Sequence, residues 1–510
     1  MLKPLDSLIS KRWDSCPPEL LRNWQIDRFR RYLRDTVLPF SKHYRELEIE
    51  PNDLRSFDDL AKLPFTQKRH LIPTEEAPNR PRDFVLIPDK DVLKRRPSTL
   101  TKALFMGKGR VERDFEREFR PIMMTSTTGR STEPVPFLYT AHDLENLKTS
   151  GIRLMQICDS RKEFRHMNLF PFAPHLAFWQ THYAGIGFNT FNIDTGGGRG
   201  MGTDASVSLM GRIKPDAIIG MPTFIYHVLQ QAVEEGLTWK NLQKVVLGGE
   251  KVPNGMRRKL KALAAELGSG KVDVLATYGF TEAKTAWPEC PNPSGESTGY
   301  HLSPDLGIVE IIDPETGTPV GENSPGEIVY SPLNARGSVV IRYRTGDEIS
   351  GGLTHEPCPS CGRSVPRLIG NISRVSDYRR LRIGKLKGTL VNFNELEHIL
   401  DDIDEIGTWQ MEIRNVNDDP LAGDEIIVHV CRNPRLRNIK RDSLNAMIRR
   451  RFQVGAEISP NRIEFHSAAQ IRDKQGVGEN LKEEKVIDLR VQDQHLDRKN
   501  KILSNQPISR

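Results

Sequence analysis

Between residues 120 and 285 the sequence alternates short apolar runs with helical stretches. The apolar runs Ala217–Ile219, Val245–Leu247 and Val272–Leu275 are each bounded by glycine or proline. Apolar residues at helical spacing lie between these runs, at Phe224–Val233 and Met256–Leu267. Short buried strands that alternate with helices are typical of a parallel sheet covered on both faces, because parallel neighbours need a crossover connection. The pattern therefore predicts an α/β fold.

The chain changes character on either side of this region. Residues 1–70 carry apolar side chains at helical spacing, whereas residues 80–120 are rich in arginine and lysine without a sustained period. Residues 305–350 contain three short runs of β-type periodicity and a turn at 313–317, which predicts an antiparallel sheet or a small barrel. The three runs lie at 308–312, 327–330 and 339–343.

A chain of 510 residues is too long for one compact core. We expect a large α/β domain over residues 1–375, with mostly parallel sheets and a small β-barrel-like part. A small α+β domain is expected over residues 376–490. Residues 491–510 contain no aromatic side chain and are expected to form a loose tail.

The composition restricts the partners and the compartment. The chain has 74 Lys and Arg against 67 Asp and Glu, so its formal net charge of +7 is a mild bias towards anionic partners and no nucleic-acid signature. No stretch approaches the roughly 20 apolar residues that span a bilayer, and the N-terminus has no signal-peptide core. Six cysteines are too few for a disulfide scaffold. We expect a cytoplasmic protein with no membrane and no nucleic-acid partner.

Three segments have the composition of a nucleotide site. Residues 124–132, Met-Thr-Ser-Thr-Thr-Gly-Arg-Ser-Thr, offer the hydroxyls, tight backbone and positive charge that phosphate oxygens need, although a polar surface turn has the same composition. Tyr278–Glu282 follows the third apolar run and supplies a hydroxyl and a carboxylate for a nucleotide and its metal. Arg342–Asp347 is read as the end of a strand with a Gly-Asp turn, whose carboxylate could bind ribose.

In this order and at these separations, the segments resemble the adenylate-forming superfamily of acyl-CoA synthetases, and in particular its phenylacetate-CoA ligase branch. Thr127–Gly129 resembles the phosphate loop of that family, and Gly248–Glu250 its adenine segment. Tyr278–Glu282 and Tyr343–Asp347 resemble its Tyr-Gly-x-Thr-Glu and Tyr-Arg-Thr-Gly-Asp elements. The resemblance extends from about Ser56 to Arg490.

The resemblance implies a role for each matched residue. The residues that would hold ATP and Mg²⁺ are Thr127, Thr128 and Gly129 for the β- and γ-phosphates, Gly249, Glu250, Tyr278 and Gly279 for adenine, Thr281 for the α-phosphate, Glu282 for Mg²⁺, and Asp347 with Arg374 for the ribose. Lys482 would act as the catalytic lysine that bridges the carboxylate and the α-phosphate, with Lys474 and Lys485 as alternatives. A solvated lysine is the other interpretation of Lys482.

A pair of cysteines indicates a zinc site. Cys358 and Cys361 form a Cys-x2-Cys pair whose spacing suits tetrahedral Zn²⁺. We favour Cys290 and His301 as the other ligands, because some members of the resembled branch are similar at these points. Four ligands would make the zinc structural. The alternatives are unmetallated thiols, or a ligand set that draws on His355, Cys16, Cys158 or Cys431.

An aromatic cluster occupies the position that shapes the acyl pocket in the resembled family. The candidate substrate-binding residues are Phe172, His175, Phe178, Gly220 and Pro222, and an ordinary core is the alternative for the aromatic ones. The glycine-rich segment 196–200 is expected to be a flexible loop and no dinucleotide fingerprint, because no helix pattern opens directly after it.

The resemblance implies ATP-dependent activation of a carboxylic acid through an acyl-adenylate, followed by thioester formation with coenzyme A after the small domain moves. The acid is expected to be small and aromatic, and an oligomer is compatible with the sequence. Transfer to an acyl carrier protein or to an amine is the alternative within this class. The alternative from another class is a basic zinc-bearing nucleic-acid or scaffold protein, since residues 432–451 hold eight Arg and Lys against one Asp.

Overall fold

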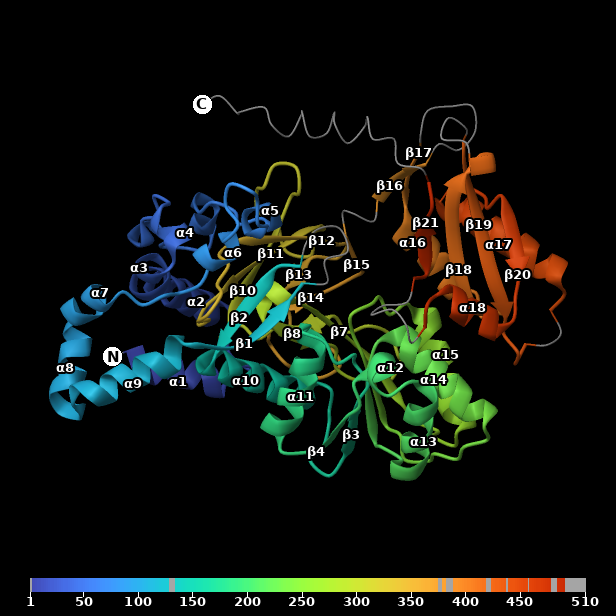
Figure 1. Ribbon diagram of the computed structural model, residues 1–510, viewed down its shortest axis with the longest axis horizontal. Helices are drawn as coiled ribbons and strands as arrows, with labels where there is room; N and C mark the ends of the chain where they lie inside the picture. Colours follow the sequence, from blue (N-terminus) through green and yellow to red (C-terminus); the bar gives the residue numbers. More distant parts are fainter. Residues whose placement is uncertain are drawn as a thin grey trace. The chain divides into compact units, whose positions relative to one another are not determined.

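The computed structural model describes the chain in eight stretches. These are residues 2–127, 134–374, 378–381, 389–418, 423–436, 439–456, 458–477 and 484–490. Its contacts divide the chain into two compact units (Figure 1). The first contains Met1–Val252 and Leu260–Val375, and the second contains Pro253–Lys259 and Ser376–Arg510.

A six-stranded sheet is the centre of the first unit, and it confirms the α/β prediction. In spatial order its strands are β4 (Phe191–Asp194), β3 (Arg165–Asn168), β5 (Ala217–Gly220), β6 (Lys244–Leu247), β7 (Asp273–Phe280) and β8 (Thr285–Pro288). The first five are parallel, and β8 returns antiparallel to β7. All residues of β5 and β6 are buried, which explains their unbroken apolar sequence.

Helices connect these parallel strands. They are α11 (Leu176–Phe188), α12 (Gly197–Gly200), α13 (Thr203–Ile213), α14 (Pro222–Glu234) and α15 (Asn254–Glu266), and α10 (Ala141–Ile157) leads from β2 (Pro136–Thr140) into β3. Thr140 and Asp143 form a reciprocal capping box that starts α10. A Cβ at Gly151 of α10 would lie 2.6 Å from the Cα of Ala184, so this glycine lets α10 pack directly against α11.

Smaller antiparallel sheets complete the first unit. They are formed by β1 (Pro121–Ser126) with β2 (Pro136–Thr140), by β10 (Gly307–Ile312), β11 (Gly326–Pro332), β12 (Tyr343–Ile349) and β15 (Ile372–Arg374), and by β13 (Leu353–Thr354), β14 (Arg367–Leu368) and β9 (Tyr300–His301). The strand predicted at 339–343 is wrong, because β12 begins only at Tyr343. Arg342 has φ +48°, which breaks the extended backbone before that point.

The N-terminal region is helical, as its apolar spacing predicts, and the helices continue through residues 80–120. These elements are α1 (Leu2–Lys11), α2 (Pro18–Tyr32), α3 (Leu38–Phe40), α4 (Lys42–Arg45), α5 (Lys68–Leu71), α6 (Arg80–Asp83), α7 (Lys90–Arg95), α8 (Pro97–Met106) and α9 (Lys108–Phe119). No helix among the described residues is both long enough and apolar enough to cross a membrane.

The second unit is an α+β domain, as predicted. Its main sheet has the order β20 (Arg462–Phe465), β19 (Asp424–Arg432), β18 (Ile406–Asn415), β21 (Val486–Asp488), and a separate hairpin joins β16 (Tyr378–Leu381) to β17 (Thr389–Asn392). Its longer helices are α16 (Phe393–Asp401), α17 (Arg441–Ala456) and α18 (Ala468–Lys474). The basic helix α17 buries Leu444, Ile448 and Phe452 in this unit's core.

Candidate functional site

Two motifs of the first unit, Tyr278–Glu282 and Tyr343–Asp347, are about sixty residues apart in the sequence and contact each other through their side chains. The Tyr278 hydroxyl donates to Oδ2 of Asp347 at 2.9 Å, and the Tyr343 hydroxyl donates to Oε1 of Glu282 at 2.7 Å. Each carboxylate is therefore oriented by the tyrosine of the other motif. The sequence motifs imply no separate role for Tyr343, although its place at the head of the second motif parallels that of Tyr278.

The motif Tyr343–Asp347 is itself strand β12, so the expectation that a strand ends at this motif is wrong. Because β12 pairs with β15, Asp347 stands directly opposite Arg374. Nε of Arg374 donates to Oδ1 of Asp347 at 2.8 Å. Asp347 is buried, whereas Arg374 is half exposed, and the carboxylate raises the pKa of Arg374 above its ordinary value. Asp347 is thus a charged acceptor held in one orientation.

Glu282 lies in a 3₁₀ turn, Thr281–Ala283, that follows β7. Burial raises the pKa of Glu282, and the hydrogen bond from Tyr343 acts against this by lowering it. Burial and the charge of Asp347 raise the pKa of Tyr278 well above the usual value, so its phenol stays a hydrogen-bond donor. Thr281 and Glu282 remain partly exposed, which leaves both available to a ligand.

The turn after β6 contains the predicted adenine segment. A Cβ at Gly248 would lie 2.4 Å from Oγ1 of Thr277 and 3.3 Å from Cζ of Phe170, so no larger residue fits there. Gly249 has φ +79°, a conformation that favours glycine. Oε2 of Glu250 accepts a hydrogen bond from Oγ1 of Thr223 at 2.8 Å, which ties this turn to the start of α14.

Gly279 is also constrained by its surroundings. It lies on β7 opposite Ala286 of β8, and a Cβ there would come within 2.7 Å of the carbonyl oxygen of Thr285. A larger residue would therefore push β8 away from β7. Gly279 therefore lets β7 and β8 pair closely at the point in the chain between Tyr278 and Glu282.

The structure describes only the edges of the predicted phosphate loop. The Thr127 amide donates to the Val135 carbonyl at 3.1 Å, and Oγ1 of Thr127 accepts from the Val135 amide at 3.0 Å. Thr127 thus closes the base of the loop. Thr128 and Gly129 lie outside the described residues, and so does Lys482. Of the alternatives to Lys482, Lys485 pairs with Asp401 at 3.3 Å within the second unit.

The candidate acyl-pocket residues lie beyond the carboxyl ends of β3 and β5. Phe172 is 66% exposed and contacts buried Phe178 edge to face, with ring centroids 5.1 Å apart. Nδ1 of His175 lies 2.9 Å from the Ser126 carbonyl oxygen, which places His175 beside the end of β1. Gly220 ends β5, and its carbonyl accepts the Gly248 amide at 3.1 Å. Pro222 is the first residue of α14.

The glycine-rich segment is not a plain loop, so that prediction is wrong. Gly197–Gly200 forms the short helix α12 and α13 begins at Thr203. A Cβ at Gly197 would lie 2.7 Å from the Leu169 carbonyl oxygen. Gly197 therefore allows this helix to pack closely against the segment that follows β3. Four glycines and an arginine at 196–200 have no apolar period, so the sequence pattern does not predict the helix.

A second cluster brings together Cys290, His301, Cys358 and Cys361. Their ligand atoms all lie within 4.8 Å of one another. Sγ of Cys290 is 3.7 Å from Sγ of Cys358, and Sγ of Cys361 is 3.3 Å from Nε2 of His301. Nδ1 of His301 faces the Pro288 carbonyl oxygen at 3.3 Å, which directs Nε2 towards the cysteines.

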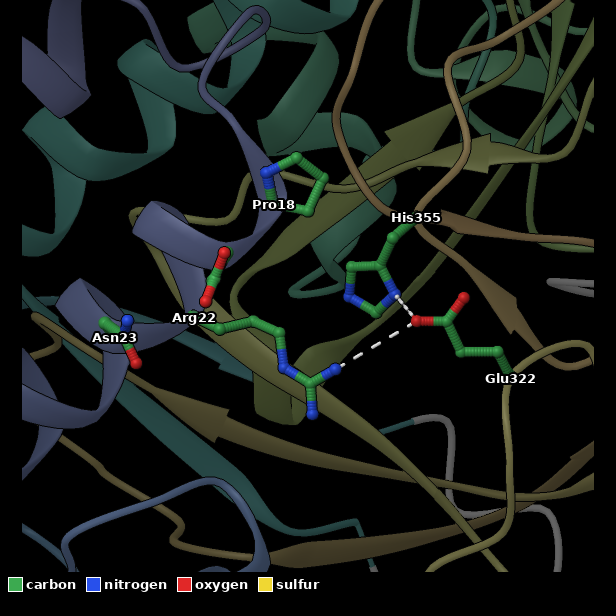
Figure 2. A pocket seen from close by; sticks show the side chains of 6 residues that line it. Pro18, Arg22, Asn23, Glu322 and His355 are labelled. Atoms are coloured by element: carbon green, nitrogen blue, oxygen red, sulfur yellow. Dashed lines mark ion pairs between the residues drawn. The ribbon is translucent and has the colours of Figure 1, made fainter.

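His355, an alternative zinc ligand in the sequence, has a different partner. Its Nδ1 pairs with Oε1 of Glu322 at 2.8 Å, and Arg22 reaches the same carboxylate at 4.0 Å (Figure 2). These three side chains line a pocket together with Pro18, Glu19 and Asn23. Apart from His355, none of the candidate site residues that the structure describes lines this pocket. Among the residues that the structure describes, the four-ligand cluster also excludes Cys16, Cys158 and Cys431.

The chain is similar in sequence to proteins of known function. Residues 195–337 match the family model of the AMP-binding enzymes. The chain is 23% identical over 472 residues to a phenylacetate-coenzyme A ligase of Thermus thermophilus, covering 91% of this chain and 92% of the relative. It is 25% identical over 368 residues to a phenylacetate-coenzyme A ligase of Aromatoleum evansii, covering 71% and 72%.

A solved structure shares the fold. It is a crystal structure of 2-hydroxyisobutyryl-CoA ligase in the postadenylation state, with a TM-score of 0.72, 19% sequence identity, and coverage of 97% of this chain and 94% of the other. At this identity the likeness concerns the arrangement of the elements and not the substrate.

Proposed function

The chain is a phenylacetate-CoA ligase-like member of the adenylate-forming superfamily, and on this premise we propose that it is an AMP-forming acid-thiol ligase. It activates a small carboxylic acid with ATP and forms a coenzyme A thioester. The single observation that supports this most is the reciprocal pairing of Tyr278 with Asp347 and of Tyr343 with Glu282.

In the first half-reaction the carboxylate attacks the α-phosphate of ATP in line, and pyrophosphate leaves. Asp347 accepts the ribose hydroxyls, and Tyr278 and Gly279 lie against adenine beside Gly249 and Glu250. Thr281 donates to the α-phosphate, and Thr127, Thr128 and Gly129 hold the departing phosphates. Glu282 would hold Mg²⁺, which supplies positive charge to the phosphates when it is bound.

Lys482 contributes the positive charge that steadies the developing α-phosphate, and the second unit rotates before the thiol attacks. Lys482→Ala should lower adenylation by 10²–10³-fold, the usual loss for one electrostatic contact to a transition state. Lys485→Ala is the matched control, because Lys485 already pairs with Asp401. Full adenylation activity of Lys482→Ala would contradict the assignment.

The acid is aromatic in this proposal. Phe172 and Phe178 present aromatic faces beyond β3, and Phe172 is unusually exposed for a large apolar side chain, which suits stacking on a ring. His175, Gly220 and Pro222 would form the remaining walls. Phe172→Ala should raise the KM for an aryl acid more than the KM for ATP. A general folding defect would not raise one of these KM values more than the other.

The Cys290–His301–Cys358–Cys361 cluster binds a structural Zn²⁺ in our proposal. In a tetrahedral site with Zn–S of about 2.3 Å and Zn–N of about 2.05 Å, two sulfurs lie about 3.8 Å apart and a sulfur and a nitrogen about 3.6 Å. The observed separations of 3.7 and 3.3 Å fit this geometry. Cys358→Ser should lose one zinc per chain by elemental analysis, and Cys431→Ser should retain it.

The decisive experiment incubates the full chain with ATP, Mg²⁺ and a panel of aryl and arylacetic acids, with and without coenzyme A. Pyrophosphate exchange reports adenylation, and mass spectrometry identifies the adenylate and the acyl-CoA. Adenylate formation with transfer only to a carrier protein or an amine would contradict the coenzyme A assignment. If no acid supports exchange, the ligase proposal fails.

A further inference from the structure

A third group of ligand-type side chains lies in the second unit, on strands that the adenylation chemistry does not use. His429 is on β19 and stands directly opposite Glu464 of β20, because the two strands are paired in parallel. His466 follows β20, and its amide donates to the Val430 carbonyl at 2.9 Å. Backbone pairing therefore fixes these three side chains on one patch of the sheet.

Their ligand atoms form a nearly regular triangle. Nδ1 of His429 lies 3.0 Å from Nε2 of His466 and 3.3 Å from Oε2 of Glu464, and Nε2 of His466 lies 3.6 Å from the same oxygen. Two nitrogen or oxygen ligands of a tetrahedral Zn²⁺, each about 2.05 Å from the metal, are about 3.3 Å apart. The mean of the three observed separations agrees with that value.

The surroundings orient these ligands. Nε2 of His429 lies 3.2 Å from Oε2 of Glu412 on β18, an arrangement in which a carboxylate fixes the ring and leaves Nδ1 for a metal. Arg462 lies 3.8 Å from the other oxygen of Glu464, Oε1, and leaves Oε2 on the side of the histidines. Arg414 is related in the same way to Glu412, at 3.8 Å from Oε1.

Exposure differs across the triangle. The side chain of His429 is 4% exposed, that of His466 is 19% exposed and that of Glu464 is 40% exposed. The interior ligand is thus rigid, and the outer two face solvent, so a fourth coordination position would be filled by water. Sites with three protein ligands and one open position are typical of exchangeable or catalytic zinc, and closed four-ligand sites of structural zinc.

We propose that His429, Glu464 and His466 bind a divalent transition-metal ion, with Zn²⁺ as the reference ion, at an open site separate from the cysteine cluster. The metal joins β19 to the end of β20 and stabilises the second unit by binding only the folded state. Nitrogen and carboxylate ligands without thiolate give this site a different spectroscopic signature from the cysteine cluster.

The test measures metal binding by the full chain. Protein is dialysed against excess Zn²⁺ and then analysed for zinc per chain, in the wild type and in a Glu464→Ala/His466→Ala double variant. Both changes are at least partly exposed, and His398→Ala on α16 is a control that removes a histidine from the same unit. The double variant should bind one zinc fewer than the wild type and than the control.

A cobalt titration gives a second readout that needs no variant. Co²⁺ at the proposed site produces ligand-field absorption without thiolate charge transfer, whereas Co²⁺ at the cysteine cluster produces both. Wild-type protein should show a thiolate-free component that the double variant lacks. Glu412→Gln should keep the stoichiometry and weaken binding by about 10–100-fold, as loss of a ligand's hydrogen-bond partner usually does. Equal zinc content in wild type and double variant, or no thiolate-free component in the wild type, would overturn the proposal.

Discussion

Tyr343→Phe removes one hydroxyl from the proposed active site and nothing else. Tyr343 is 3% exposed, and its ring is inclined by 28° to the ring of Phe280 with the two ring centroids 6.4 Å apart, a contact that phenylalanine preserves. The lost interaction is the hydrogen bond to Oε1 of Glu282 at 2.7 Å. That hydrogen bond favours the ionised carboxylate and opposes the effect of burial. Without it, burial raises the pKa of Glu282 further.

The size of the effect follows from the charge on the acceptor. A hydrogen bond to a charged group contributes about 1.5–3 kcal/mol, so the loss of this bond should raise the pKa of Glu282 further. Because adenylation needs the ionised carboxylate for Mg²⁺, the acid limb of the pH–rate profile should move to higher pH. The ratio of wild-type to variant rate should therefore grow as the pH falls.

Pyrophosphate exchange from pH 5 to pH 8.5, at saturating acid and ATP, measures this shift. Tyr330→Phe is a matched control, because the Tyr330 hydroxyl donates to the neutral Ala283 carbonyl at 3.5 Å in the same turn. Its acid limb should stay in place. An acid limb of Tyr343→Phe that is unchanged, or that moves to lower pH, would refute the reasoning.

Three further predictions concern affinity and stability. Asp347→Asn removes the charge that Arg374 faces and should raise the KM for ATP about 10–100-fold in exchange assays, with fold retained by circular dichroism. Glu310→Gln unpairs the buried guanidinium of Arg342 and should lower the free energy of unfolding in urea by about 3–5 kcal/mol. Burial lowers the pKa of His166 to about 4, so between about pH 6.5 and pH 4 the unfolded state binds this proton and the folded state largely does not. Stability should fall by up to about 3 kcal/mol between pH 6.5 and pH 4, and His166→Gln should flatten that part of the urea profile.

The sequence predicts the parallel sheet well because β5 and β6 are buried on both faces, which forces unbroken apolar runs. It fails at residues 80–120, where Val111, Phe115 and Phe119 do recur at helical spacing in α9. That helix is short and highly charged, and few of its side chains are buried, so its apolar stripe is narrow. The apolar pattern at 339–343 predicts an extended Arg342, whereas Arg342 has φ +48° and its side chain donates to Glu310, a distant residue that no local pattern contains.

The candidate site was predictable to the level of motifs but not of partners. Sequence order cannot reveal that Tyr343 would orient Glu282 while Tyr278 orients Asp347, because this depends on the placement of β12 beside β7. The histidine cluster is hidden for the same reason, since His429 and Glu464 are paired only through the register of β19 and β20.

The reciprocal pairing also implies that the two motifs act as one unit. Each tyrosine orients a carboxylate on the other motif, so a shift of either segment disturbs both the ribose acceptor and the Mg²⁺ ligand. Groups in one hydrogen-bonded network show interaction energies of about 0.5–3 kcal/mol in double-mutant cycles, whereas distant and independent sites are additive. Tyr278→Phe and Tyr343→Phe should therefore combine with less than additive loss of adenylation, because the first change already releases the constraint that the second removes. Strict additivity of the two losses would mean that each motif positions its own carboxylate and that the hydrogen bonds between them do not hold the site together.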